Sequence, residues 1–146
     1  HTVSNPNFQT GTGSVDFILN SIYTLRKNNW GTNLDLTYKI NTTNSNKYKF
    51  GNKTRFASNV FYQYSSKEIT LMPNLGATAE IYNKDKDKHK TNDLSGGYLC
   101  SLTLGSEFYY KKITTGFIYQ IPISQRISDG ELRFNNSFNY HLTILF

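Results

Sequence analysis

The sequence predicts an all-β protein, an antiparallel up-and-down transmembrane β-barrel. Three observations support this prediction: apolar and polar residues alternate along seven segments, the links between segments alternate between short and long, and aromatic residues lie near the segment ends. An alternation with a period of two places each set of side chains on its own face of a strand. The chain of 146 residues also holds 11 Tyr and 10 Phe. This aromatic content favours strands.

The composition is consistent with a barrel although it resembles that of a polar protein. The mean hydropathy is -0.54, and no segment approaches the roughly 20 consecutive apolar residues of a membrane-spanning helix. Strands of a transmembrane barrel average to a mildly polar value because only one face is apolar. The net charge of +6 includes lysines that alternate with Asp85, Asp87 and His89. This pattern predicts a solvated loop and no nucleic-acid partner.

The first two segments set the pattern. Residues 13–25 carry apolar side chains at odd positions, and Ile18 and Ile22 fall on the otherwise polar face. Residues 30–41 alternate without exception, with apolar side chains at even positions only. Both segments are therefore expected to be strands with one apolar and one polar face.

The third and fourth segments continue the alternation. Residues 47–64 have apolar side chains at even positions, with Ala57 and Phe61 as exceptions, and residues 69–81 have them at odd positions. Pro73 lacks the backbone N–H that a sheet requires, so it predicts a bulge or a weak pairing point in the fourth strand.

The last three segments are residues 97–110, 113–125 and 132–146. Ser124 is expected on the polar face of the sixth strand. The single cysteine, Cys100, cannot form a disulfide within the chain and is expected to be a buried or lipid-facing small residue.

The links indicate an orientation in the membrane. Short links fall at residues 27–29, 65–68 and 111–112, and longer polar links at 42–46, 82–95 and 126–131. Outer-membrane barrels have short periplasmic turns and longer extracellular loops, so Phe146 is expected in the periplasm.

Aromatic residues at both strand ends are expected to form interfacial girdles. Those near the short links are Trp30, Tyr62, Tyr64, Phe108, Tyr110 and Phe146, and those near the long links are Tyr38, Tyr48, Phe50, Tyr98 and Phe134.

Seven strands are expected to be only part of the barrel. Bacterial single-chain barrels contain an even number of strands, and open sheet edges are not viable in lipid. We therefore expect residues 1–12 to be an extracellular loop or N-terminal segment, and residues 13–146 to be barrel strands preceded by others. The alternative is a complete small barrel with an eighth strand within residues 1–12, which Pro6, Gly11 and Gly13 disfavour.

The end of the chain carries a family resemblance. The alternate residues Phe138, Tyr140, Leu142, Ile144 and Phe146 resemble the β-signal that the barrel-assembly machinery recognises. Residues 5–16 and the hairpin 95–125 look like the C-terminal half of transporter-like, phenol meta-pathway-like outer-membrane proteins of Bacteroidota. The resemblance implies a Gram-negative outer membrane, with its lipid, the assembly machinery during biogenesis and other outer-membrane proteins as partners. It implies a location and a fold more than a chemistry.

The polar faces supply the candidate functional residues, which would line the lumen of a porin-like pore or transporter for small solutes, since lumen charges tune selectivity. These residues are Asp16, Asp35, Lys39, Lys53, Arg55, Glu80, Glu107 and His141. The alternative function is a structural or accessory barrel subunit of a larger outer-membrane complex, whose aromatic outer face could dock a partner. A third hypothesis, a soluble lipid-binding barrel, would place the apolar face inside.

Enzymatic chemistry is not expected. The Gly11-Thr12-Gly13 sequence lacks the remainder of a phosphate-binding loop, and the residues 85–89 lack the glycine and distal glutamate of a calcium loop. His141 lies on the predicted lumen face together with a serine and an asparagine, whereas a phospholipase-like site would need them on the lipid-exposed face. We therefore expect no catalytic residue, cofactor or metal site.

Overall fold

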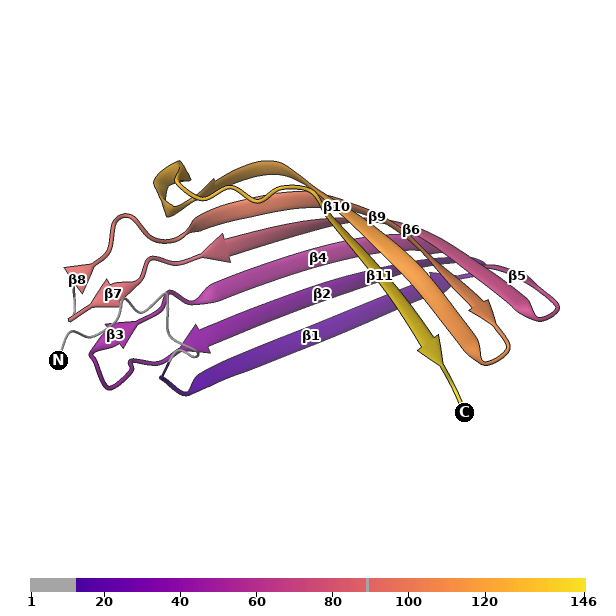
Figure 1. Cartoon of the computed structure of the whole chain (residues 1–146), viewed down its shortest axis with the longest axis horizontal. Helices are drawn as coiled ribbons and strands as arrows, with labels where there is room; N and C mark the ends of the chain where they lie inside the picture. The colour runs from indigo at the N-terminus through magenta and orange to yellow at the C-terminus, as the bar shows by residue number, and fades with distance from the viewer. Residues whose placement is uncertain (1–12, 89) are drawn as a thin grey trace.

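The computed structural model describes residues 13–88 and 90–146, which form antiparallel β-structure (Figure 1). A 3-10 turn, η2 (Ser128–Gly130), lies before the last strand. The strands are β1 (Asp16–Lys27), β2 (Trp30–Asn41), β3 (Tyr48–Lys49), β4 (Lys53–Tyr62), β5 (Tyr64–Ser66), β6 (Ile69–Tyr82), β7 (Lys86–Asp87), β8 (Lys90–Thr91), β9 (Gly97–Tyr110), β10 (Ile113–Ile127) and β11 (Ser137–Ile144). The predicted N-terminal segment, residues 1–12, lies outside the described residues.

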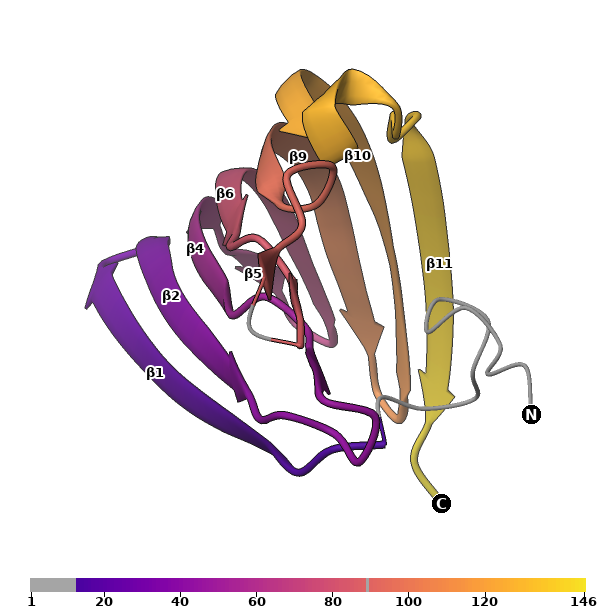
Figure 2. The same ribbon diagram turned by 90° about the vertical axis from the view of Figure 1, so that its left-hand side faces the viewer.

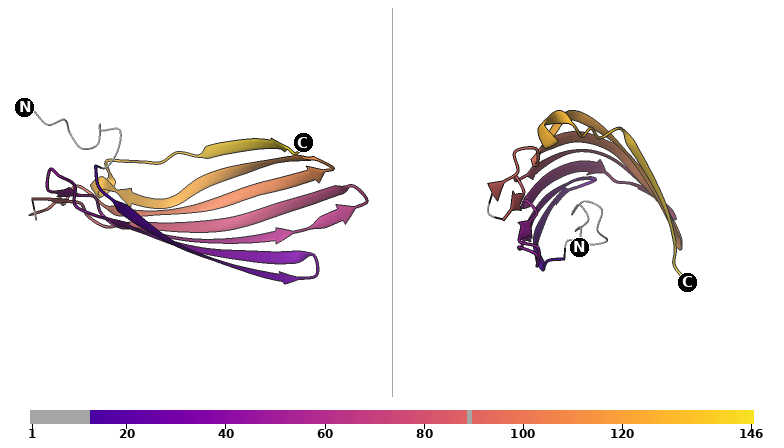
Figure 3. Two further views of the ribbon diagram at one scale, coloured as in Figure 1. Left: turned by 90° about the horizontal axis from the view of Figure 1, so that it is seen from below. Right: turned by 60° about the vertical axis from the view of Figure 1, so that its left-hand side comes forward.

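The main sheet has eight strands in the order β1-β2-β4-β6-β9-β10-β11, with β5 paired to β6. Each long strand pairs antiparallel with its neighbour in sequence, which is the predicted up-and-down order. The sheet twists and curves into an arch (Figures 2 and 3). We call the end with the links β1–β2, β5–β6 and β9–β10 the short-link end, and the opposite end the long-link end.

The third predicted strand is not continuous. Its first part, β3, pairs with β7 in a separate three-stranded sheet at the long-link end. Its second part is divided into β4 and β5, which pair with β6 in one register, from Phe61 opposite Asn74 to Tyr64 opposite Leu71. The pairing is interrupted opposite Pro73, as predicted, because proline has no N–H to donate.

The bulge of the sheet lies elsewhere, in β10. Its register against β9 shifts between Pro122 and Ser124. This extra residue reverses the facing of the following positions, so Ser124 pairs with Cys100 and lies on the apolar face. The expectation that Ser124 lies on the polar face was therefore wrong.

The last strand is shorter than predicted. The segment before it turns through η2 and makes a single bridge from Ile127 to Leu132 before β11 begins at Ser137. Residues 132–136 thus belong to the long link and not to the strand. The alternation in that stretch is not accompanied by strand pairing in the described residues.

The two faces of the arch differ in chemistry. Thr24 on β1 and His141 on β11 come from opposite edges of the sheet, yet they line one hollow of ≈ 610 Å³. Residues from opposite edges of a curved sheet can line one hollow only on its concave side. The predicted polar face, which contains Thr24 and His141, is therefore the concave face. The apolar positions are convex and exposed, as Leu104 is to 55%.

The three short links have a common geometry. Each is two residues long, and its first residue has a positive φ: 55° at Asn28, 48° at Lys67 and 49° at Lys111. A left-handed conformation is unfavourable for most side chains and is tolerated by asparagine, which hydrogen-bonds its own backbone. Two of the three links therefore place a lysine where asparagine fits better.

Replacing Lys67 with asparagine should raise the free energy of unfolding by up to about 1 kcal/mol, because strain at this position is relieved. Denaturant titration of the full chain in detergent micelles measures this change. The matched control is Lys112→Asn, at the second position of another short link, where φ is not positive. Equal effects of the two substitutions would contradict this explanation.

Candidate functional site

The charged residues predicted for the polar face all lie on the concave face of the sheet. The structure brings every one of them into contact with another member of the set: Asp16 pairs with Lys39, Asp35 and Glu80 with Arg55, and Glu80 with Lys53, while Glu107 and His141 form a hydrogen bond. The set divides into a group toward the long-link end and a single pair toward the short-link end.

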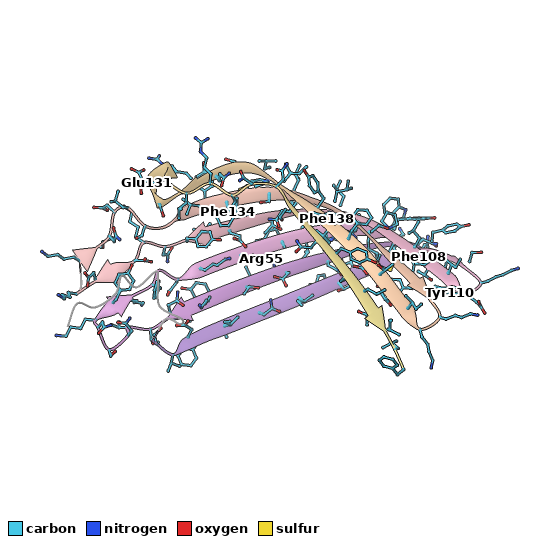
Figure 4. All side chains as sticks on the ribbon, in the orientation of Figure 1. Arg55, Phe108, Tyr110, Glu131, Phe134 and Phe138 are labelled. Carbon is cyan, nitrogen blue, oxygen red and sulfur yellow. The ribbon has the colours of Figure 1, made fainter. Side chains whose placement is uncertain are left out.

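The group toward the long-link end is centred on Arg55 of β4 (Figure 4). Its guanidinium lies 3.1 Å from the Asp35 carboxylate on β2 and 3.6 Å from Glu80 on β6. Lys53 lies 3.1 Å from Glu80, whose side chain is 15% exposed. The charges therefore alternate in sign across three strands, and each half-buried carboxylate has a cation as partner, which limits its desolvation cost.

Neutral groups complete the bonding of these carboxylates. Asp35 accepts hydrogen bonds from the Thr37 hydroxyl at 3.1 Å and the Asn20 amide at 3.2 Å. The Tyr82 hydroxyl donates to Glu80. A network in which each member has several partners is held in one arrangement more firmly than an isolated surface pair.

The pair toward the short-link end depends on a glycine. Glu107 on β9 and His141 on β11 both lie opposite Gly116 of the intervening strand β10. They meet over it, with His141 Nε2 and Glu107 Oε2 3.1 Å apart. A Cβ on residue 116 would lie 2.7 Å from the histidine ring and 2.8 Å from the carboxyl carbon. Glycine at this position therefore provides the space for the pair.

Sequence analysis did not single out Arg26, which also lies on the concave face. Its guanidinium lies 5.3 Å from the centre of the Phe61 ring, a distance that suits a cation–π contact. Phe61 is the aromatic exception to the alternation of its segment and is only 6% exposed. Arg26 follows the first predicted segment, residues 13–25, directly and continues its even, polar positions, and this was the available signal.

The long links form a structured unit at their end of the sheet. The Asp85 carboxylate accepts hydrogen bonds from the Tyr48 hydroxyl at 2.5 Å and the Gly51 backbone N–H at 2.7 Å. Burial, the hydrogen bond to Asp85 and its charge raise the pKa of Tyr48 above its ordinary value. The prediction of a plain solvated loop at residues 82–95 was incomplete, since this link contains β7 and β8 and pairs with β3.

The predicted assembly-signal residues share the other face. Phe138, Tyr140, Leu142 and Ile144 are exposed on the convex side of β11, and Phe146 follows the strand. The Phe138 ring stacks on Phe117 of β10, with ring centres 6.2 Å apart. The aromatic residues predicted at strand ends also contact one another, as Trp30 and Tyr62 do at the short-link end, at 5.0 Å.

Within residues 13–88 and 90–146, no three His, Cys, Asp or Glu side chains cluster in a way that could hold a metal ion. His89, named in the sequence analysis, lies outside the described residues. Among the residues described, no helix has the length and apolar character required to cross a membrane.

The protein is a curved antiparallel sheet whose long strands are adjacent in sequence order. Its convex face is apolar and exposed, and its concave face carries ion pairs. No family model, curated protein or solved structure matches the chain.

Proposed function

We propose that this chain forms part of the wall of a β-barrel in a bacterial outer membrane, and that the barrel is a pore or transporter for small solutes. One observation carries the proposal. Along the described strands of the main sheet, the convex face has no charged side chain between Lys27, at the short-link end, and Arg126, at the long-link end. The concave face of the same sheet carries both acidic residues, such as Asp35 and Glu80, and basic residues, such as Lys39 and Arg55.

Exposure of the apolar convex face to water would be energetically unfavourable. Side chains across the convex face, including Leu19, Leu75 and Leu104, are more than half exposed, and soluble monomers rarely expose contiguous apolar patches of more than a few hundred Å². Lipid is a favourable surrounding, because outer-membrane barrels present an apolar band outward and polar residues inward. The same distribution disfavours the soluble lipid-binding barrel, which requires an apolar concave face.

The proposal includes further strands. In the sheet described here, β1 and β11 have no partner on their outer edges, and both run from the long-link end to the short-link end. Antiparallel closure therefore requires an odd number of added strands between them, and a bilayer requires closure because unpaired backbone groups are costly in hydrocarbon. The added strands would lie outside the described sheet.

Planar-bilayer recording with the full-length protein tests the proposal. We expect discrete channel openings, and flotation of the protein with lipid vesicles after salt washing. Protein that remains in detergent-free buffer would contradict the membrane location. Flotation without openings above background would contradict the pore and would favour the accessory barrel of a larger complex.

A further inference from the structure

We infer that the concave face carries a binding site for an uncharged, polyhydroxylated solute such as a sugar. This inference rests on the proposed pore and adds the class of solute to it. The structural basis is a row of neutral polar positions across the full width of the sheet, between two groups of charged residues. Within this row, the side chains of Thr103 and Gln120 make no hydrogen bond, whereas the carboxylates on either side, such as Asp35 and Glu107, have partners.

The strand register defines this neutral row. Consecutive pairings connect one position on each long strand, from the first edge of the sheet to the last. The positions are Thr24, Asn33, Asn59, Gly76, Thr103, Gln120 and Ser137. None is charged and none has an aliphatic or aromatic side chain, although every strand places apolar residues one position away on the other face.

Charges lie on both sides of the neutral row. Asp35 and Arg55 are two and four positions from the row toward the long-link end, and Glu107 is four positions from it toward the short-link end. The acidic residues of the concave face, Asp16, Asp35, Glu80 and Glu107, equal in number its basic residues, Arg26, Lys39, Lys53 and Arg55. This face of the described sheet therefore has no net charge with which to select ions of either sign.

The neutral groups are available for a solute. In the described part of the chain, the side chains of Thr78, Thr103, Gln120 and Asn139 make no hydrogen bond, and all four line one recess of ≈ 300 Å³ on the concave face. Arg55 and Glu80, which pair with each other, line the same recess. Amide and hydroxyl groups supply donors and acceptors together. A sugar hydroxyl likewise donates and accepts, so it can satisfy these groups without the desolvation cost of an ion.

The recess also contains an unsatisfied acceptor. Asn59 Oδ1 is buried without a hydrogen-bond partner, and its amide nitrogen makes a long contact of 3.4 Å to Asn74. Buried polar atoms without partners are uncommon in folded proteins. A small rearrangement of this amide toward a bound hydroxyl would satisfy it, which is consistent with a solute at this place.

Uptake by proteoliposomes tests the inference with two solutes of nearly equal size, glucose and glucuronate, which differ by one carboxylate. The full-length protein should take up glucose several-fold faster than glucuronate. The substitution Gln120→Lys, which places a cation in the neutral row, should reverse this preference. Both solutes are measured in the same vesicles, so the ratio does not depend on the fraction of protein that has folded.

A second variant tests binding itself. Thr103→Val with Gln120→Leu removes free donors and acceptors, and should slow glucose uptake by roughly 10-fold if each lost hydrogen bond contributes its usual amount. Leu104→Ile on the convex face is the matched control and should leave the uptake ratio unchanged. Equal uptake of both solutes through an open pore would overturn this inference and leave the proposed pore intact. Absence of conductance and uptake would instead overturn the proposed function.

Discussion

The substitution Leu102→Arg should destabilise the protein folded in lipid vesicles by about 2 to 4 kcal/mol, because it places a cation at mid-height on the convex face. Leu102 lies near the middle of β9 (Gly97–Tyr110) and is 41% exposed on that side. If the convex face contacts lipid, the new charge has no partner there and must remain in hydrocarbon or distort the bilayer. Denaturant titration of folding into vesicles of defined composition measures the loss.

The neighbouring position provides the control. Thr103 lies on the concave face, beside the recess of ≈ 300 Å³, so an arginine at this position can reach water and the carboxylates of the proposed lumen. Thr103→Arg should therefore cost much less than Leu102→Arg. Equal costs, or a greater cost for Thr103→Arg, would show that the faces are assigned wrongly and that the lipid-facing convex surface should be abandoned.

The second large effect is expected at Gly31, where the concave face has no space for a side chain. A Cβ on this residue would lie 2.1 Å from the tip of the Phe61 ring, which covers the glycine from the paired position on β4. Valine is a good strand former, yet Gly31→Val should destabilise the protein by about 1 to 3 kcal/mol, because the buried ring must be displaced. Thermal or denaturant unfolding in micelles measures the change.

A double-mutant cycle with Phe61→Ala isolates the cause. Without the aromatic ring, the space over Gly31 is open, so Gly31→Val should cost little in that background and the two substitutions should be strongly non-additive. Additive losses would mean that glycine is required at position 31 for another reason, and that the packing of the Phe61 ring does not explain it.

The alternation of residue types predicted most of the sheet because it reports directly on facing. The limits of β2 (Trp30–Asn41) and of β9 (Gly97–Tyr110) agree with the predicted segments, and the candidate polar-face residues all lie together on the concave side. A period of two carries this information whether or not the sheet closes, so the faces could be predicted. The same period does not predict closure, and the described residues form an open sheet.

The remaining features depend on how strands pair with one another, and the residue pattern of a single strand does not contain this information. The bulge before Ser124 reverses the facing of the residues after it, and nothing in the alternation marks its position. The association of β3 with β7 joins two distant links by a pairing of only two residues on each side. The role of Gly116 likewise requires its register with Glu107 and His141, since alone it is an ordinary strand glycine.

The ion pairs of the concave face imply a particular pattern of variation among related sequences. Residue 55 contacts residues 35 and 80 on its two neighbouring strands, so a change of sign at one position should be tolerated when the partners change with it. Leu104 and the other convex positions require only apolar character and should vary independently among aliphatic and aromatic types. Aligned relatives should therefore show covariation across strands on one face and unlinked substitution on the other, a contrast that can be checked from sequences alone.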